Sequence, residues 1–189
     1  MGKRRSGLVF YEKKKIVSKA LVAEILSWFF YTLIAVLVAW LLANGFGYSV
    51  FMRGSSMLPE IKNGQRVLID RVLYRLRSPG RGDIIAFYPN GNESAHLMIR
   101  RIVGLPGETV RIEDGIIYIN DKPATDQEHS YDRIADAGIA ANGITLRDKD
   151  YFVLGDLRNI GEDSRSPQIG NVSKDAIVGK AWLWMGASQ

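Results

Sequence analysis

The chain has 189 residues, 47% of them hydrophobic and 24% charged, and it carries a formal net charge of +5. This length suits one globular domain of ordinary size with an appended segment, rather than two full domains. Because there is no cysteine, a disulfide, a thiol nucleophile and a Cys-ligated zinc site are excluded. The two histidines, His96 and His129, lack metal-binding spacing and are interpreted as solvated loop residues, so we expect no metal site.

The positive charge is concentrated at the N-terminus. Residues 1–24 hold seven lysines and arginines against two glutamates, and the remaining residues carry no net charge. We therefore expect a short basic tail over residues 1–24. We expect no electrostatic surface for the phosphates of a nucleic acid on the rest of the chain.

Residues 25–44 are predicted to form a transmembrane helix. From Ile25 to Ala43 the sequence ILSWFFYTLIAVLVAWLLA has no charge, proline or glycine. At ~1.5 Å per residue, such a run spans roughly the ~30 Å hydrocarbon core of a bilayer. A buried core helix is one alternative, but the run is apolar on every face. A cleaved signal peptide is another, but the run exceeds the ~7–15 apolar residues that are typical of one.

The basic tail predicts the orientation of this helix. Lysine and arginine favour the cytoplasmic side of a membrane, so residues 1–24 are expected in the cytoplasm and residues 45–189 outside it. The interpretation is a single-pass protein of the plasma membrane, with the lipid bilayer as a partner and an extracytoplasmic domain beside it.

Residues 45–189 are predicted to be rich in β-strands. Runs of β-branched and aromatic residues alternate there with Gly, Pro, Asn and Asp. These runs cover residues 66–74, 83–88, 97–103, 109–112, 116–120, 150–155 and 176–184. Asp114-Gly115 favours a tight type I′ hairpin turn between two of them. Residues 121–148 form a polar stretch without periodicity, which we interpret as a surface excursion from the domain.

The last predicted strand contains two tryptophans. By simple alternation, Val178, Lys180, Trp182 and Trp184 lie on one face of it. Packing in the core and contact with the membrane interface would each explain these tryptophans.

Four motifs follow the apolar run in order along the chain. They are GSSMLP (54–59), GDIIAF (82–87), RRIVGLPGE (100–108) and GDLRNIGEDSR (155–165). Together with the N-terminal anchor they resemble the bacterial type I signal peptidases, a family of Ser/Lys-dyad serine endopeptidases, in their short Gram-positive form. The resemblance implies an all-β, signal-peptidase-type domain with one N-terminal transmembrane helix. It also implies removal of signal peptides from exported preproteins, without a cofactor.

The family resemblance identifies a nucleophile. It is the serine directly before the methionine of the S-M-x-P box, which here is Ser56. The resemblance also implies the backbone N–H of Ser56 as an oxyanion donor. It places Gly54, Met57 and Pro59 in the oxyanion and groove region. Gly54 stands where some members carry a hydroxyl, so a side-chain donor is missing there.

The general base of the family is a lysine, and Arg100 occupies its position. Desolvation can lower the pKa of a lysine from about 10.4 towards neutrality, whereas the pKa of arginine is so high that arginine stays charged in a protein. Arg100 is therefore not expected to act as a general base. Lys62, Lys174, or a water molecule with Asp83 are the other candidates. A purely structural role for Arg100 would pair it with a carboxylate such as Asp83 or Asp163.

The late motif departs from the family in a related way. Gly161 stands where the family has the serine that orients the lysine. Asp156, Asp163, Ser164 and Arg165 are retained, and we expect them to hold the loop together through ion pairs and turn hydrogen bonds.

Two functions are compatible with these observations. The first is a membrane-anchored serine endopeptidase in which Ser56 attacks the carbonyl after a small residue, in an Ala-x-Ala-like sequence that the resemblance implies. The second is a catalytically impaired signal-peptidase-like protein that binds a signal peptide or another extracytoplasmic chain as a binding or assembly factor. The retained Ser56 favours the first function, and Arg100 together with Gly161 favours the second.

Overall fold

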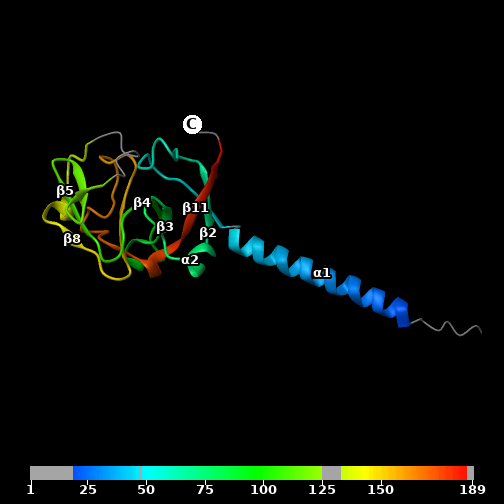
Figure 1. Cartoon of the computed structure of the whole chain (residues 1–189). Helices are drawn as coiled ribbons and strands as arrows, with labels where there is room; N and C mark the ends of the chain where they lie inside the picture. The colour runs from blue at the N-terminus through cyan, green and yellow to red at the C-terminus, as the bar shows by residue number, and fades with distance from the viewer. Residues whose placement is uncertain (1–18, 47, 125–132, 187–189) are drawn as a thin grey trace, which may run out of the picture. The chain divides into compact units, whose positions relative to one another are not determined.

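The computed structural model describes residues 19–46, 48–124 and 133–186, and Figure 1 shows their arrangement into helices and strands. The chain divides into two compact units, Met1–Leu41 and Leu42–Gln189, which are described separately. Most of the predicted basic tail and His129 lie outside the described residues.

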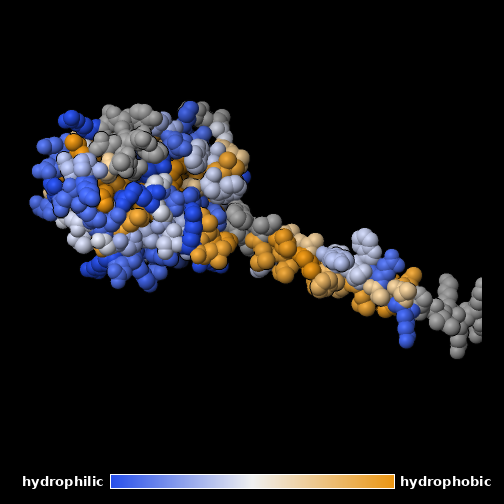
Figure 2. Space-filling model, in the orientation of Figure 1, coloured by the Kyte–Doolittle hydropathy of each residue, from blue (hydrophilic) through white to orange (hydrophobic). Residues whose placement is uncertain are grey.

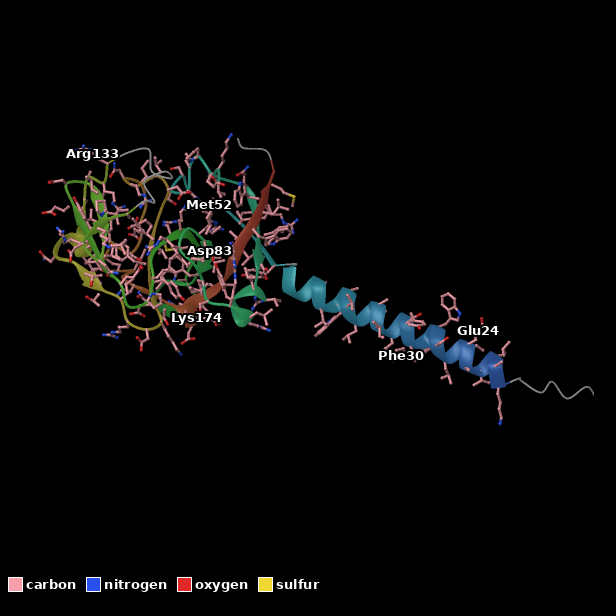
Figure 3. All side chains as sticks on the ribbon, viewed as in Figure 1. Glu24, Phe30, Met52, Asp83, Arg133 and Lys174 are labelled. Carbon is pink, nitrogen blue, oxygen red and sulfur yellow. The ribbon has the colours of Figure 1, made fainter. Side chains whose placement is uncertain are left out.

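The described residues of the first unit belong to helix α1 (Lys19–Phe46), which continues into the first residues of the second unit. Its segment Lys19–Leu41 is long and apolar enough to cross a membrane, and it is the one such segment among the described residues. None of this span is buried inside the protein, which argues against a core helix. Figure 2 shows hydrophobic residues along most of the helix, and Figure 3 labels Phe30 within it.

The helix is longer than the predicted residues 25–44. It begins at Lys19 among the described residues and ends at Phe46. Lysine, alanine, leucine and glutamate are all good helix formers, so the helix need not begin where the charges end. Hydropathy indicates the part that fits a bilayer, whereas backbone hydrogen bonding determines the length of the helix.

The second unit is built on two antiparallel sheets. Strand by strand from one edge, the seven-stranded sheet contains β1 (Tyr48–Phe51), β2 (Arg66–Asp70), β11 (Ile177–Met185), β3 (Ile84–Phe87), β4 (Met98–Gly104), β9 (Asp150–Leu154) and β10 (Val172–Ser173). The four-stranded sheet contains β7 (Lys122–Pro123), β6 (Ile116–Ile119), β5 (Thr109–Glu113) and β8 (Ile144–Thr145). The short helices are α2 (Leu73–Leu76), η1 (Pro89–Gly91), η3 (Gly138–Asn142) and η4 (Lys174–Ala176). The expected all-β class with one N-terminal helix is confirmed.

The type I′ turn is also confirmed. Asp114 and Gly115 have φ values of 51° and 75°, and Glu113 pairs with Ile116 across the hairpin. Positive φ at both central residues is the signature of this turn, because it matches the twist of the two strands.

The predicted strand over 66–74 is wrong in its second half. Strand β2 ends at Asp70, whose side-chain Oδ1 accepts hydrogen bonds from the backbone N–H groups of Val72 (2.9 Å) and Leu73 (3.0 Å). An aspartate that bonds the backbone two and three residues ahead turns the chain out of the sheet. The chain then forms α2, although the β-branched and aromatic residues had indicated a strand.

The polar stretch over 121–148 contributes to the core, which the prediction of a surface excursion missed. Ile134, Ala140 and Leu146 are buried and pack with β5, β6 and β9 side chains. These apolar residues are too widely spaced to produce a periodic pattern, so the sequence does not show which of them point inwards.

The predicted face with both tryptophans is also wrong. The pairing of β11 with β2 shifts register between Ala181 and Leu183, so Trp182 lies at a bulge. One extra residue reverses the alternation beyond it. Trp184 packs against the core, whereas Trp182 is 46% exposed.

The core fixes the position of the segment that precedes β2. Ile84 and Ala86 of β3 face one hydrophobic cluster, and their neighbours in sequence face another. Met57 and Ile61 from the segment between β1 and β2 are fully buried in the first of these clusters. This segment, residues 52–65, is called the serine loop because it carries Ser56.

Candidate functional site

The serine loop is closed at its base by backbone hydrogen bonds. Met52 N–H donates to Gln65 O at 2.8 Å, and Gly64 N–H donates to Met52 O at 2.9 Å. With Met57 and Ile61 anchored in the core, the loop holds Ser56 in a fixed position. Ser56 is only 4% exposed.

The loop that follows β9, residues 155–165, lies directly against Ser56. Leu157 N–H donates to Ser56 O at 3.0 Å. A Cβ atom on Gly155 would come within 2.7 Å of the same carbonyl oxygen, a distance that two such atoms do not tolerate. The absence of a side chain at Gly155 therefore allows the two backbones to meet.

Gly155→Ala should separate these backbones and destabilise the protein. We expect a loss of about 1–3 kcal/mol in the free energy of unfolding, the usual cost of an overpacked site. Urea denaturation followed by tryptophan fluorescence measures it. Gly80→Ala is the matched control, because a Cβ atom there would meet its nearest neighbour at an ordinary 3.7 Å. Equal stability of both variants would contradict the close approach at Gly155.

Arg100, Gly161 and Ser56 meet at one point. A Cβ atom on Gly161 would lie 3.0 Å from Cβ of Ser56, 3.7 Å from its Oγ and 3.3 Å from Nη2 of Arg100. The backbone of Gly161 has a φ of +85°, in the region that favours glycine. The residue at the family's base position and the residue at its orienting position thus both lie beside Ser56.

The guanidinium of Arg100 is buried and bonded to backbone carbonyls. Nε and Nη2 donate to Glu162 O at 2.8 Å and 2.5 Å, and Nη1 donates to Ile99 O at 2.6 Å. Arg100 is 6% exposed. Burial lowers the pKa of the Arg100 guanidinium, and the negative charge of Asp163 opposes that shift. An arginine in these contacts remains a cation and a donor, so it cannot take a proton from Ser56.

The expected ion pair of Arg100 with Asp83 or Asp163 is wrong. Among the described residues, the salt bridges of Asp83 involve Lys180 at 2.5 Å and Arg77 at 3.9 Å. Asp163 pairs with Arg165 instead. The partners of Arg100 are backbone carbonyl oxygens and not a carboxylate. A sequence pattern does not predict which backbone carbonyls a side chain will reach.

Asp83 is a poor replacement base. Burial alone would raise the pKa of its carboxyl, but hydrogen bonds from Lys180, Gly80 and Tyr74 outweigh burial and lower that pKa. A carboxylate with a lowered pKa and occupied oxygens accepts another proton weakly.

Other possible bases do not hydrogen-bond to Ser56 either. Lys174 lies near Ser78, and in Figure 3 it lies well below Met52, which begins the serine loop. Lys62 is exposed on the turn that closes the loop. His96 is exposed, as predicted, and its Nδ1 lies 3.4 Å from Arg53. Within the described part of the chain, Ser56 Oγ makes no hydrogen bond to a lysine, a histidine or a carboxylate.

A buried ion pair joins β4 to the loop after β9. Arg101 binds Asp156 through two parallel hydrogen bonds, Nε to Oδ1 and Nη2 to Oδ2, each 2.7 Å long. Arg101 Nη1 also donates to Gly82 O at 3.0 Å. Paired bonds of this kind fix both distance and direction. They position the start of the loop, where Gly155 meets Ser56.

A second ion pair closes the other half of the loop. Arg165 Nε and Nη2 donate to the two carboxylate oxygens of Asp163, each at 2.9 Å. Ser164 Oγ accepts from Val153 N–H at 3.0 Å, and Ser164 N–H donates to Val153 O. These contacts fold the loop back onto β9 and bring Glu162 O to Arg100.

The groove residues suggested by the resemblance have different environments. Met57 lies in the core, so its side chain anchors the loop and is not available for contact with a ligand. Gly54 N–H donates to Asn63 Oδ1 at 2.9 Å, so it is not available as an oxyanion donor. Pro59 is exposed and follows a cis peptide bond with Leu58.

Gly155 and Asn63 also support the site, although the sequence analysis did not select them as site residues.

Gly161 lines an open cavity of about 350 Å³. Its walls are partly polar and partly apolar, and they belong largely to the loop after β9, with a contribution from the segment before η3; they include Asp136, Asn159, Gly161, Glu162, Asp163 and Arg165. Gly161, which lies beside both Ser56 and Arg100, is the residue that the cavity shares with this point.

A protein-family model described as signal peptidase, peptidase S26, matches residues 25–185. The chain belongs to the signal peptidase I family. A probable signal peptidase I-2 of Synechocystis is 33% identical over 137 residues, which are 70% of this chain and 60% of that protein. Signal peptidase I T of Bacillus subtilis is 32% identical over 82% of this chain and 81% of that protein. Signal peptidase IB of Staphylococcus aureus is 28% identical over 83% and 87%.

A solved structure is similar as well. The crystal structure of a signal peptidase I from Enterococcus faecalis has 29% sequence identity and a TM-score of 0.46, and it covers 56% of this chain and 98% of that one. Signal peptidase I proteins are serine endopeptidases that remove signal peptides. The apolar helix α1 fits the membrane anchor of the family.

Proposed function

We propose that this signal peptidase I family member binds the signal peptides of exported preproteins outside the cytoplasm, with Ser56 at the centre of its peptide site. In this proposal α1 anchors the chain, with the N-terminus in the cytoplasm. The family assignment over residues 25–185 and the closed serine loop support this function.

We further propose that cleavage by a serine and lysine pair is impaired in this chain. The observation that carries this step is the set of Arg100 hydrogen bonds to Glu162 O and Ile99 O, which leaves the guanidinium beside Ser56 as a buried cation. Loss of a general base typically costs a factor of about 10²–10⁴ in rate. The second candidate function, a fully active endopeptidase, is favoured by the retained Ser56 but needs a base that the described contacts do not supply.

Binding of a preprotein tests the proposal. The detergent-solubilised full chain should bind a preprotein with an Ala-x-Ala site, and binding should weaken when both alanines are changed to arginine. The affinity of each preprotein is measured with the preprotein bound to a surface and the full chain in solution. Equal binding of the two preproteins, or binding of neither, would contradict the proposal. Cleavage products in the same samples would support the endopeptidase instead.

A further inference from the structure

The positive charge of Arg100 is not balanced by a carboxylate of its own. The other two arginines of the site are paired, Arg101 with Asp156 and Arg165 with Asp163. Arg100 donates to backbone carbonyls, and among the described residues no carboxylate lies within salt-bridge distance of it. A buried cation without a counter-ion is costly, so the site favours an anion that reaches it.

Arg100 also has donor capacity left. A guanidinium carries five N–H groups. Three donations are accounted for, one from Nε and one from each of Nη1 and Nη2. Each Nη atom therefore keeps one N–H without a partner among the described residues. Nη2 lies on the side of Ser56, 3.3 Å from the position that a Cβ atom of Gly161 would take.

Ser56 has two further donors. Its backbone N–H and its hydroxyl make no hydrogen bond with any described residue, although Ser56 is buried. Gly161 places no side chain between Ser56 and Arg100 Nη2, and the gap is narrow, because a Cβ atom there would lie only 3.0 Å from Cβ of Ser56. Gly161 is also one of the residues that line the cavity of about 350 Å³.

We propose that this site binds the free C-terminal carboxylate of a peptide that ends in a small residue, such as a signal peptide after cleavage. The proposal rests on the signal-peptide function proposed above and names the state of the peptide that binds best. A carboxylate is planar and carries one negative charge, which suits the remaining guanidinium and serine donors. An intact peptide bond at the same place is neutral and gains less from Arg100.

Fluorescence anisotropy of labelled peptides tests the proposal on the detergent-solubilised full chain. Three peptides carry the same signal sequence: one ends at Ala-x-Ala with a free carboxylate, one ends there with an amide, and one continues beyond the site. The carboxylate peptide should bind about 10- to 100-fold more tightly than the other two, the range expected of a hydrogen bond to a charged group.

Variants show whether Arg100 is responsible. Arg100→Gln should remove the preference for the carboxylate, and Arg100→Lys should retain much of it at a pH low enough to keep the lysine protonated. Arg75→Gln removes an exposed arginine on α2 and should leave the preference unchanged. A melting curve for each variant confirms that it is folded. A preference that survives in folded Arg100→Gln would overturn the proposal.

Two further outcomes separate this proposal from the function on which it rests. If all three peptides bind equally well, the carboxylate site is wrong, and signal-peptide binding stands. If none binds, both are wrong. Acetate at the peptide concentration should not displace the carboxylate peptide; displacement would show a general anion site and overturn the peptide part of the proposal.

Discussion

Arg100→Lys is expected to increase cleavage of a preprotein with an Ala-x-Ala site by about 10²–10⁴-fold over the unaltered protein, the usual contribution of a general base. A lysine at this position reaches towards Ser56 from the same strand, β4, and can lose its proton when it is buried. Single-turnover cleavage, followed on gels, measures the rate. The double variant Arg100→Lys with Ser56→Ala should return to the background rate.

The pH dependence of this variant gives an independent check. A lysine acts as a base only when it is deprotonated, so the cleavage rate of Arg100→Lys should rise with pH. Burial lowers the pKa of a lysine from about 10.4, so the rise should begin well below that pH. A rate that stays at the level of the unaltered protein at every pH would show that arginine is not what limits cleavage.

The second large effect is expected for Asp156→Ala. This change leaves the buried guanidinium of Arg101 without its two hydrogen-bonded oxygens. Breaking a buried ion pair on one side typically costs about 3–5 kcal/mol of unfolding free energy. Native proteins have a free energy of unfolding of only about 5–15 kcal/mol, so this loss would remove a large part of the stability of the fold. Urea denaturation of the full chain in detergent measures the loss.

Two controls accompany this measurement. Glu113→Ala breaks the exposed pair with Arg111 and should change stability little, because solvent screens such pairs. Asp156→Ala combined with Arg101→Leu should be more stable than Asp156→Ala alone, because no unpaired charge remains. If Asp156→Ala and Glu113→Ala are equally stable, the buried pair does not hold the loop.

Much of the fold could be predicted from the sequence, because local patterns produce it. Runs of β-branched and aromatic residues between turn residues located the main strands, and Asp114-Gly115 located a hairpin whose positive φ values follow from those two residue types. The errors arose where a local feature overrode the pattern. Asp70 turned the chain out of β2, and the bulge at Trp182 reversed the alternation of β11.

The site could be predicted only in part. The motifs selected Ser56, Arg100 and Gly161 from a family resemblance, and in the structure these residues lie within contact of one point. The partners of Arg100 were not predictable, because they are main-chain carbonyls brought close by the fold. The contact of Gly155 with Ser56 was missed for the same reason: no side chain takes part in it.

The contacts of Arg100 give one physical account of the two departures from the family. A guanidinium is larger than an ammonium group and carries more donors. Here it reaches Glu162 O, and Gly161 offers no side chain that would occupy the space beside it. The result is a serine beside a permanent cation, an arrangement suited to holding an anion.

We propose that Arg100 leaves Ser56 without an activating base. Single-turnover cleavage of an Ala-x-Ala preprotein by the unaltered full chain tests this proposal, run beside Ser56→Ala, with binding of the preprotein measured for both. Both proteins should bind the preprotein, and their cleavage rates should differ by less than about tenfold, since general base assistance alone is worth about 10²–10⁴-fold. Rapid cleavage by the unaltered protein that disappears in Ser56→Ala would contradict it.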